Sequence, residues 1–354
     1  MKRIVMTGGG TAGHVTPNIA LIPRLKKMGY EIHYIGTKDG IERGLIEAQG
    51  IPYHSISAGK LRRYLDLKNL TDTFRVVRGF NDAMSVLRKL KPDVVFSKGG
   101  FVSCPVVWAA KMRGIPAIIH ESDMTPGLAN KLSIPFARKI CYTFPETKDY
   151  IPKEKGVLTG IPVRESLFSG KAELGKRLCG FNDKLPVMII VGGSQGSQVL
   201  NNAIRGILNE LLKKFQICHM CGKGNVDQSL NNLSGYKQFE YINEELPHVF
   251  AMADLVVSRA GATTIYELLA LKKPNLLIPL SKQASRGDQI LNAQSFEKQG
   301  FSKVLMEEEL NSKSFMENVE ELYSGRTPYI KAMENSAVGN GTEKILELIR
   351  SYTR

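Results

Sequence analysis

Short apolar runs alternate with longer segments of helical spacing, and this alternation starts twice along the chain. In the first half, Lys2–Thr7 is predicted as a strand, Pro17–Met28 as a helix and Glu31–Ile35 as a second strand. Three further strands are predicted at 93–97, 117–120 and 139–143. Strands that alternate with helices are typical of a parallel, doubly wound sheet.

The second half repeats the scheme. The apolar run Pro186–Val191 precedes a glycine-rich turn, and a helix is predicted from about Gln198 to Lys213, with further strands at 216–220, 255–258 and 275–278. We therefore predict an α/β protein with two Rossmann-like, doubly wound parallel-sheet domains that face a central cleft. Glycine and proline at 160–162 indicate the hinge, and the predicted last helix, roughly 341–352, can pack on either domain.

Composition narrows the protein class. The 354 residues are enough for two domains, each with its own core. No apolar run approaches the roughly 18 residues that a membrane-spanning helix needs. The chain starts without the apolar core of a signal peptide, and its five cysteines are scattered, which is consistent with reduced thiols. We expect a cytoplasmic location.

The net charge of +14 is concentrated in the first half of the chain. Residues 1–160 hold 25 Lys and Arg against 13 Asp and Glu, a net charge of +12, and the remainder carries +2. Such an excess favours an anionic partner: a nucleic acid, an anionic lipid or a phosphorylated substrate.

Residues 8–14 read GGGTAGH, and Gly8, Gly10 and Gly13 satisfy the G-x-G-x-x-G pattern of dinucleotide sites. A dinucleotide site also needs an acidic residue about 20 positions on, at the end of the second strand. Here Asp39 follows only beyond Gly36. The sequence therefore disfavours a dehydrogenase. It leaves a turn whose backbone N–H groups can bind phosphate at a helix N-terminus.

His14 lies where this turn becomes helix. Histidine is the side chain most easily used as a general base near neutral pH. The alternative is that His14 only caps or packs against the turn.

Two turns in the second half also suit phosphate. Gly192–Gly196 presents backbone amides and the Ser194 hydroxyl, and 258–267, SRAGATTIYE, begins a helix at small residues. Glu267 is one turn into that helix, where it can accept hydrogen bonds from a ribose diol. The alternative is that these glycines serve only helix packing. No D-x-D occurs, so we expect no metal and no cofactor, and backbone amides with arginine would stabilise a leaving diphosphate.

Six motifs carry a resemblance that runs nearly end to end. They are GGGTAGHVTP, HESDMTPGLANK, GIPVRES, VVGGSQGSQVLN, SRAGATTIYEL and DQILNA. Their order and spacing resemble the MurG family, bacterial enzymes that transfer N-acetylglucosamine from UDP to the lipid-linked muramyl-pentapeptide of peptidoglycan synthesis. The resemblance implies a GT-B fold with an acceptor domain at 1–162, a donor domain at 163–340, and a last helix, about 341–354, that packs back on the first domain.

The resemblance also implies roles for individual residues. It places Thr11, Ala12 and Gly13 near the transferred sugar and diphosphate, and Arg164 near the nucleotide. Ser194 is expected on phosphate, Ile242 on uracil and Glu267 on ribose. The helix end under the pyrophosphate would be formed by Ala262, Thr263 and Thr264, and Gln289 would bind the sugar hydroxyls. The chain departs from the family pattern at Ala12 (usually glycine), at Thr16 (often aromatic), and at Ser122 and Asp123 (usually Gln and Asn). Asp123 brings a carboxylate to the position of an amide, which bears on donor affinity and acceptor identity.

The reaction expected from this resemblance is an inverting single displacement. The muramyl 4-hydroxyl attacks the anomeric carbon of UDP-N-acetylglucosamine, with His14 as the base and Glu121 as its competitor. The partners are then the UDP-sugar, the undecaprenyl-pyrophosphoryl-muramyl-pentapeptide (lipid I) and an anionic membrane surface, which places the enzyme on the cytoplasmic face of the membrane as a peripheral protein.

The segment 60–91 is predicted to meet that membrane. It contains nine basic and three acidic residues, with Leu70, Phe74, Val77 and Phe80 at helical spacing. An interfacial helix or loop fits this pattern, and the alternative is an apolar stripe that faces the core.

The remaining features concern a candidate metal motif and three alternative functions. Cys218 and Cys221 form one C-x-x-C without a second pair, which favours core or strand-end thiols over a zinc site. A glycolipid synthase or a UDP-N-acetylglucosamine 2-epimerase would share the nucleotide site. A nucleic-acid-binding protein would fit the charge, but the sequence has no recognised motif for it, and we expect no nucleic acid partner.

Overall fold

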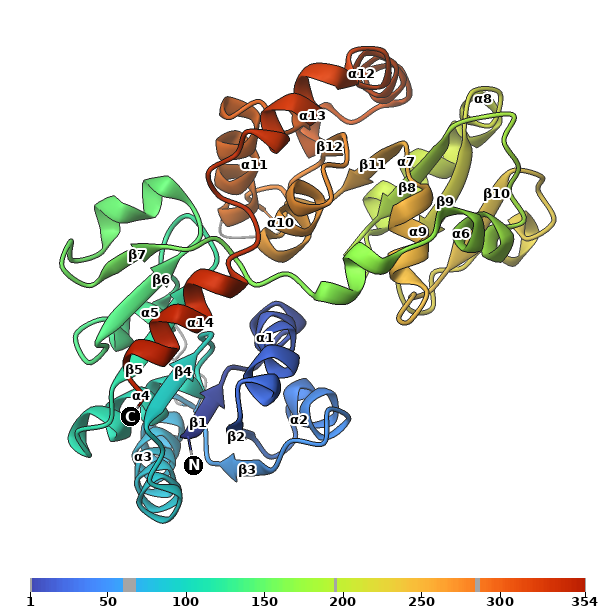
Figure 1. Ribbon diagram of the computed structural model, residues 1–354. Helices are drawn as coiled ribbons and strands as arrows, with labels where there is room; N and C mark the ends of the chain where they lie inside the picture. The colour runs from blue at the N-terminus through green and yellow to red at the C-terminus, as the bar shows by residue number, and fades with distance from the viewer. Residues whose placement is uncertain (1, 60–67, 194–195, 284–286, 354) are drawn as a thin grey trace. The chain divides into compact units, whose positions relative to one another are not determined.

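The computed structural model describes residues 2–59, 68–193, 196–283 and 287–353, without the side chains of residues 12 and 68–73. The chain divides into two units (Figure 1). Unit 1 consists of Met1–Arg164 and Asn340–Arg354, and unit 2 consists of Glu165–Gly339.

Unit 1 is built on a parallel sheet, which has seven strands within the described residues. Their order is β3-β2-β1-β4-β5-β6-β7, and every pair is parallel. The strands are β1 (Lys2–Thr7), β2 (Tyr30–Thr37), β3 (Tyr53–Ile56), β4 (Val94–Ser97), β5 (Ala117–Glu121), β6 (Lys139–Tyr142) and β7 (Gly156–Leu158).

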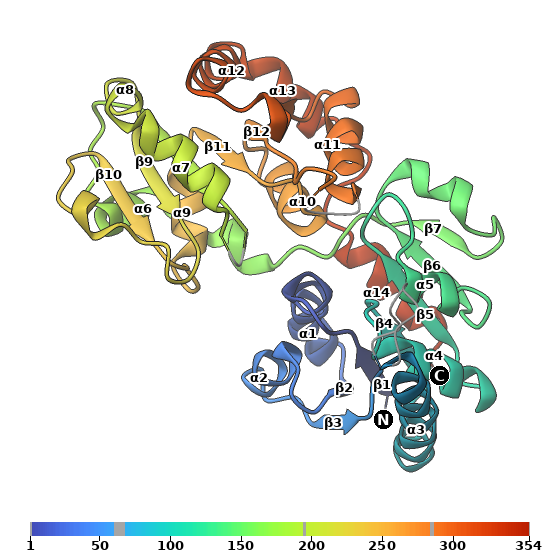
Figure 2. The same cartoon turned by 180° about the vertical axis from the view of Figure 1, so that it is seen from behind.

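Helices cover both faces of this sheet because its central strands are apolar on both sides. Ile4 and Phe96 lie on the face of the sheet that α1 and α14 cover, and Val5 and Val95 lie on the opposite face, under α3 and α4. Figure 2 shows the molecule from the side of α3 and α4. The helical elements are η1 (Ala12–His14), α1 (Thr16–Lys27), α2 (Ile41–Glu47), α3 (Lys68–Leu90), α4 (Ser103–Met112), α5 (Leu128–Ser133), η2 (Pro145–Tyr150) and α14 (Thr342–Ser351).

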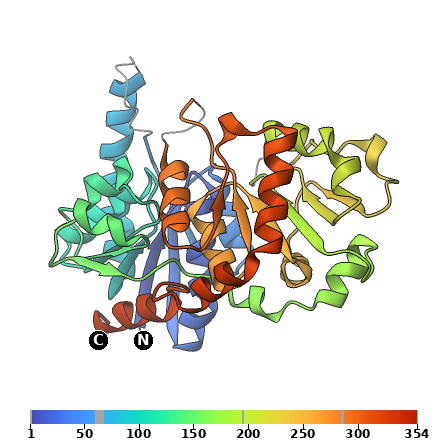
Figure 3. The same ribbon diagram turned by 90° about the horizontal axis from the view of Figure 1, so that it is seen from above.

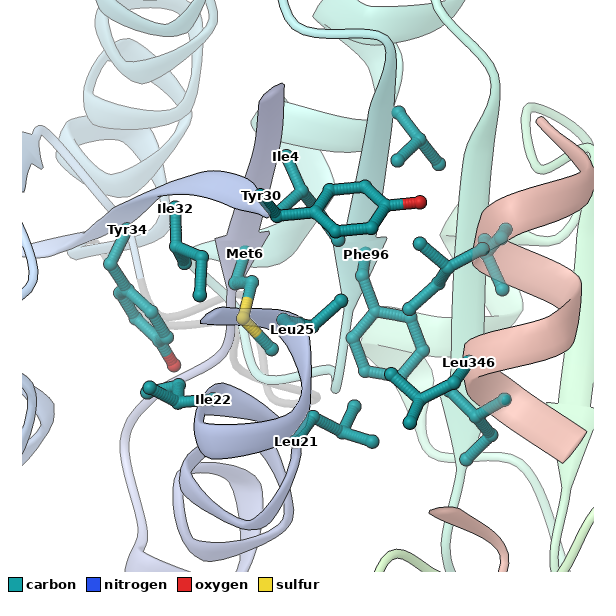
Figure 4. Packing of buried hydrophobic residues seen from close by; sticks show 14 of the residues in the cluster. Ile4, Met6, Leu21, Ile22, Leu25, Tyr30, Ile32, Tyr34, Phe96 and Leu346 are labelled. Carbon is teal, nitrogen blue, oxygen red and sulfur yellow. The ribbon is translucent and has the colours of Figure 1, made fainter. Parts of the chain in front are cut away.

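The last helix is part of the core of unit 1. Ile345, Leu346 and Ile349 of α14 are buried, and Leu346 lies beside Phe96 of β4 (Figure 4). Arg24 of α1 also pairs with Glu343 at 2.7 Å. The apolar face of α14 is therefore buried against a sheet whose last strand ends more than 180 residues earlier in the sequence.

Unit 2 repeats the architecture. Its strands are ordered β10-β9-β8-β11-β12-β13 in the described part of the chain, and all pairs are parallel. They are β8 (Val187–Val191), β9 (Gln216–Met220), β10 (Tyr236–Phe239), β11 (Leu255–Ser258), β12 (Asn275–Leu277) and β13 (Lys303–Val304). The prediction of two doubly wound parallel-sheet domains is confirmed.

The helices of unit 2 flank this sheet. Residues of α7, α8 and α12 pack on one face, together with Met188 and Val257. The helical elements are η3 (Glu165–Ser169), α6 (Ala172–Cys179), α7 (Gln198–Gly206), α8 (Leu208–Leu211), η4 (Gln228–Leu230), α9 (Leu246–Met252), α10 (Ala262–Ala270), α11 (Asp288–Lys298), η5 (Glu307–Glu309), α12 (Ser312–Ser324) and α13 (Arg326–Glu334).

The prediction of one continuous helix over 198–213 is wrong. The chain leaves the helical conformation at Ile207 (φ −121°, ψ 14°), between α7 and α8. Gly206 precedes the break, and glycine is a poor helix former. Leu200, Ile204, Ile207, Leu208 and Leu211 are all buried in the core, at a spacing that one continuous helix would also give, so the apolar pattern does not reveal the break.

The strand orders define where ligands bind. In unit 1 the order reverses between β1 and β4, and in unit 2 it reverses between β8 and β11. In open parallel sheets the loops that leave such neighbouring strands diverge and open a crevice at their carboxyl ends. The segments predicted to bind phosphate begin at Gly8, Gly192 and Ser258, at the carboxyl ends of β1, β8 and β11.

Candidate functional site

The glycine turn of unit 1 is tightly packed. The N–H group of Gly9 donates to the carbonyl oxygen of Gly99 at 3.3 Å, which joins the turn after β1 to the turn after β4. Gly100 has a φ of +85°, and a Cβ there would lie 2.3 Å from the carbonyl oxygen of Gly9. Glycine is therefore required at position 100 both by conformation and by space.

A buried carboxylate supports the same turn. Glu42 accepts hydrogen bonds from the N–H group of Gly10 at 3.2 Å and from the N–H and hydroxyl groups of Thr37 at 2.9 and 2.6 Å. Burial raises the pKa of Glu42, but these donors outweigh burial and hold the pKa below its ordinary value. A Cβ on Gly9 would lie 2.6 Å from this carboxyl group. Glu42 thus links the second strand to the glycine turn.

His14 closes the turn and is half-buried. Its Nδ1 lies 3.1 Å from the Gly9 carbonyl oxygen and 3.1 Å from the Thr11 hydroxyl. A carbonyl oxygen only accepts, so Nδ1 is assigned as the protonated nitrogen and the neutral ring carries its lone pair on Nε2. This tautomer is the one that a general base acting through Nε2 requires. Thr11 and Gly13 are exposed on the same turn.

Glu121, the competing candidate, ends β5 in the interior. Its carboxylate accepts from the N–H groups of Asp123 and Gly127, both at 3.0 Å, and from the Asn130 side chain at 2.8 Å. Burial, followed by the Asp123 carboxylate, raises the pKa of Glu121. Both oxygens of Glu121 are thus used to shape the loop 122–127, which favours a supporting role.

Lys98, which the sequence analysis did not single out, lies between these groups. It follows β4 directly, its side chain is buried, and its ammonium donates to the hydroxyl of Ser122. Burial lowers the pKa of Lys98 to about 8, although Glu121 and Asp123 favour its charged form. A lysine two positions after the apolar run Val94–Phe96 and directly before two glycines is the signal that could have marked its position, though not its role.

The first glycine turn of unit 2 leads into α7. Gly193 and Gly196 have φ values of +92° and +77°, and a Cβ on Gly196 would lie 2.1 Å from the carbonyl oxygen of Cys221. Ser197 caps the helix by accepting from the N–H group of Leu200 at 3.3 Å. The predicted phosphate ligand Ser194 lies outside the described residues.

The second turn of unit 2 presents a helix start without a side-chain cap. α10 begins after Gly261, whose conformation is extended (φ −68°, ψ 132°) and which has no side chain to satisfy the first N–H groups. Ala262, Thr263 and Thr264 form the first turn. Glu267 lies further along the same helix, 6% exposed. Free N–H groups and the helix dipole favour an anion at such a terminus.

Arg259 ties the two turns of unit 2 together. Its guanidinium donates to the Ser197 hydroxyl at 2.5 Å and to the carbonyl oxygens of Ile278 and Pro279 at 3.1 and 3.3 Å. It also pairs with Glu307. One buried arginine therefore connects the ends of β8, β11 and β12, and sequence reasoning gave it no role.

The other predicted ligands lie at the same edge of the unit 2 sheet or at the unit boundary. Ile242 is buried just after β10. Gln289, at the start of α11, accepts from the N–H group of Leu280 at 3.2 Å. Arg164 is half-buried and is the last residue of the first segment of unit 1.

Cys218 and Cys221 are buried in or just after β9, and both are free thiols. The hydrogen bond that Cys218 donates to Cys179, followed by burial, raises the pKa of Cys218. Within the described residues no three His, Cys, Asp or Glu side chains gather as a metal site. The burial of both side chains matches the predicted core and strand-end thiols.

The basic segment 60–91 divides into an anchored and an exposed part. Within α3, Ala83 and Leu87 are buried, and Asp82 accepts from the N–H group of Ser57 at 3.0 Å. Phe74 and Val77 are 75% and 55% exposed. Figure 3 shows the first turns of α3, in light blue, extending past the rest of unit 1.

The residues of the predicted apolar stripe differ in their exposure to solvent. Phe80 packs against the core of unit 1, so the alternative of a core-facing stripe holds for this end of the helix only. Arg75 and Arg78 are exposed beside Phe74 and Val77. Residues 60–67, which include Lys60, lie outside the described residues, and so does the side chain of Leu70. No described helix is long and apolar enough to cross a membrane.

The chain is similar to known proteins over almost its whole length. The Glycosyltransferase family 28 N-terminal domain matches residues 4–142, and the Glycosyltransferase family 28 C-terminal domain matches residues 187–349. The UDP-N-acetylglucosamine–N-acetylmuramyl-(pentapeptide) pyrophosphoryl-undecaprenol N-acetylglucosamine transferases of Clostridium tetani and Lachnoclostridium phytofermentans are both 61% identical to it, over 99% of this chain and 98% of theirs. The crystal structure of Acinetobacter baumannii MurG matches with a TM-score of 0.78 at 28% identity, over 99% of this chain and 100% of that one.

Proposed function

The chain belongs to the MurG family of N-acetylglucosamine transferases. From this premise we propose that it transfers N-acetylglucosamine from UDP-N-acetylglucosamine to lipid-linked N-acetylmuramyl-pentapeptide, with release of UDP. The observation that carries this proposal is the 61% identity to such transferases over 99% of the chain. A similarity of that extent favours this reaction over a related glycolipid synthase or a 2-epimerase, which would need only the nucleotide site in common.

Unit 2 binds the nucleotide in this proposal. The pyrophosphate lies on the uncapped N–H groups of Ala262–Thr264, and each favourable charge–dipole contact contributes about 0.3–1 kcal/mol. Glu267 binds the ribose diol, Ile242 meets the uracil through its backbone, and Gln289 binds the sugar hydroxyls. Ser194 and Arg164 bind phosphate. Arg259 supports this geometry by holding the turns after β8 and β11 together.

Unit 1 supplies the base. The acceptor 4-hydroxyl oxygen bonds to the anomeric carbon while the bond from that carbon to the diphosphate breaks. The electron pair of the broken bond leaves with UDP, and the hydroxyl proton passes to Nε2 of His14. His14 is preferred over Glu121 because hydrogen bonds from Asp123, Gly127 and Asn130 occupy both oxygens of Glu121.

No divalent cation is required in this proposal, because N–H groups and arginine stabilise the leaving diphosphate. The sequence motif that usually holds such a cation, D-x-D, does not occur in the chain. Transfer is therefore expected to continue in excess EDTA. A rate that collapses in EDTA and returns with Mg²⁺ would contradict this part.

The decisive experiment is transfer of labelled N-acetylglucosamine from its UDP donor, with and without the lipid-linked muramyl acceptor. We expect UDP release and a labelled lipid product only when the acceptor is present. Interconversion of the UDP-sugar without an acceptor would indicate the epimerase instead, and transfer to a different lipid would indicate a glycolipid synthase.

Membrane association follows from the acceptor, and we place it on the exposed part of α3 at the cytoplasmic face of the membrane. Exposed Phe74 and Val77 flanked by Arg75 and Arg78 suit an anionic lipid surface. Sedimentation with vesicles that contain anionic lipid tests this placement, with the variant Phe74→Ser/Val77→Ser beside the wild type. Binding that ignores lipid charge, salt and these substitutions would remove α3 from the membrane contact.

A nucleic acid partner is the non-enzymatic alternative, and the same preparation tests it. Nucleic acid binding through the basic residues of unit 1 would weaken steeply as salt is raised. We expect no saturable binding to DNA or RNA at physiological salt.

A further inference from the structure

Lys98 stands out among the buried charges because no part of the proposed function uses it. It lies 1% exposed at the carboxyl end of β4, the strand beside the switch point of unit 1. Its backbone N–H group donates to the Thr7 carbonyl oxygen at 2.9 Å, and its Cβ lies under the glycine turn, 3.1 Å from where a Cβ on Gly8 would be.

The end of this side chain meets the loop that follows β5. The ammonium donates to the Ser122 hydroxyl, so it reaches the residue between Glu121 and Asp123. The charged and titratable groups that interact with Lys98 are Asp123 on this loop, Glu121 and His120 of β5, and Cys141 of β6. His120 and Cys141 are buried, burial lowers the pKa of His120 and raises the pKa of Cys141, and both are therefore neutral near pH 7.

This neighbourhood needs a positive charge. Glu121 and Asp123 bring two carboxyl groups to one short loop, and the N–H group of Asp123 itself donates to Glu121. Two like charges in a partly buried place repel each other and would also repel a diphosphate. A buried lysine is costly on its own, so its presence beside two acids indicates a compensating pair of charges.

On the basis of the function proposed above, we propose that Lys98 is a positioning residue for sugar transfer: it neutralises the Glu121–Asp123 pair and holds the loop 122–127 against the glycine turn that carries His14. Lys98 does not touch the reacting atoms in this proposal. It acts through the loop, and its charge allows Asp123 to be a carboxylate beside an anionic donor.

The test is a double-variant cycle on the full-length enzyme in the acceptor-dependent transfer assay. The variants are Lys98→Met, Asp123→Asn and the combination of both, with Lys111→Met at the exposed end of α4 as the matched control. For each variant kcat, KM and the Kd for UDP are measured, and the fluorescence of Trp108 checks that unit 1 is folded.

We expect Lys98→Met to lower kcat at least 10-fold and the double variant to recover at least 5-fold of that loss, because it removes one charge of each sign. The Kd for UDP is expected to stay within 2-fold, since the proposed nucleotide ligands on α10 and α11 belong to unit 2. The kcat of the wild type falls above about pH 8 as Lys98 loses its proton, and this decrease is absent from the double variant.

Several outcomes overturn the assignment. They are unchanged kcat in Lys98→Met, a loss that Asp123→Asn does not relieve, or the same alkaline decrease in the double variant. If Lys98→Met does not fold, the double variant decides: a folded but inactive double variant overturns the assignment. An inactive wild type overturns the proposed function and this assignment with it, whereas an active wild type with an unaffected Lys98→Met overturns this assignment alone.

Discussion

The buried charge of Lys98 makes a prediction about stability that does not depend on the reaction. In the unfolded chain a lysine keeps its proton up to its ordinary pKa of 10.5, whereas in the folded protein burial lowers the pKa to about 8. Between these values the unfolded chain binds more protons than the folded one. The free energy of unfolding must therefore rise with pH in this window.

The magnitude follows from the two pKa values. Each unit of difference corresponds to about 1.36 kcal/mol, so the full effect is at most about 3 kcal/mol. Between pH 7 and pH 9 the contribution of Lys98 changes by about 1 kcal/mol, because the folded state loses most of this proton over that range while the unfolded state loses hardly any. Lys98→Met cannot titrate, so the stability of the wild type relative to this variant should rise by that amount.

The assay is urea unfolding at pH 7 and pH 9, followed by tryptophan fluorescence. Trp108 is the sole tryptophan of the chain. It lies in α4, where its indole N–H donates to the Leu132 carbonyl oxygen at 3.1 Å, so the signal reports unit 1. Lys111→Met, at an exposed lysine of the same unit, serves as the control. A wild-type minus Lys98→Met difference that is flat or falls between the two pH values would refute the reasoning.

Three further predictions concern other parts of the molecule. His14→Ala should lower kcat by roughly 10²–10⁴-fold, the usual contribution of a positioned base, without changing the affinity for UDP; near-normal turnover would remove His14 as the base. Glu267→Ala should weaken UDP binding at least 10-fold in calorimetry, and an unchanged Kd would mean that Glu267 does not bind the ribose. Leu346→Ala should destabilise unit 1 by about 2–5 kcal/mol because it leaves a cavity against Phe96; a Trp108 unfolding transition that does not move would contradict the packing of α14.

The more central strands of both sheets could be predicted because most are short, largely apolar runs between turn residues. The strands β3, β7, β10 and β13 were not predicted, since they are very short or contain polar residues. Observed and predicted bounds are identical for β1, β9 and β11. Helix limits were less accurate, since apolar spacing does not reveal a break such as Ile207, where the side chain stays buried on both sides of the change in direction.

The candidate site was only partly visible in the sequence. Glycine turns that follow strands predict close backbone approach, and Gly100 and Gly196 each lie against a carbonyl oxygen that a Cβ would meet. Phosphate binding at these turns stays a prediction. The roles of Lys98, Glu42 and Arg259 were not predictable, because each acts on strands or turns distant in sequence.

The sequence by itself determined the two-fold repeat of strand, glycine turn and helix, and its similarity to family members determined the kind of enzyme. Local spacing suffices for this, since hydrophobic periodicity and the absence of a Cβ are properties of neighbouring residues. Only the tertiary structure decided that α14 completes the core of unit 1, that α3 exposes Phe74 while burying Leu87, and that Lys98 faces two acids. Burial and electrostatic pairing depend on which strands lie side by side, and that is settled by the order of the sheet rather than by the order of the chain.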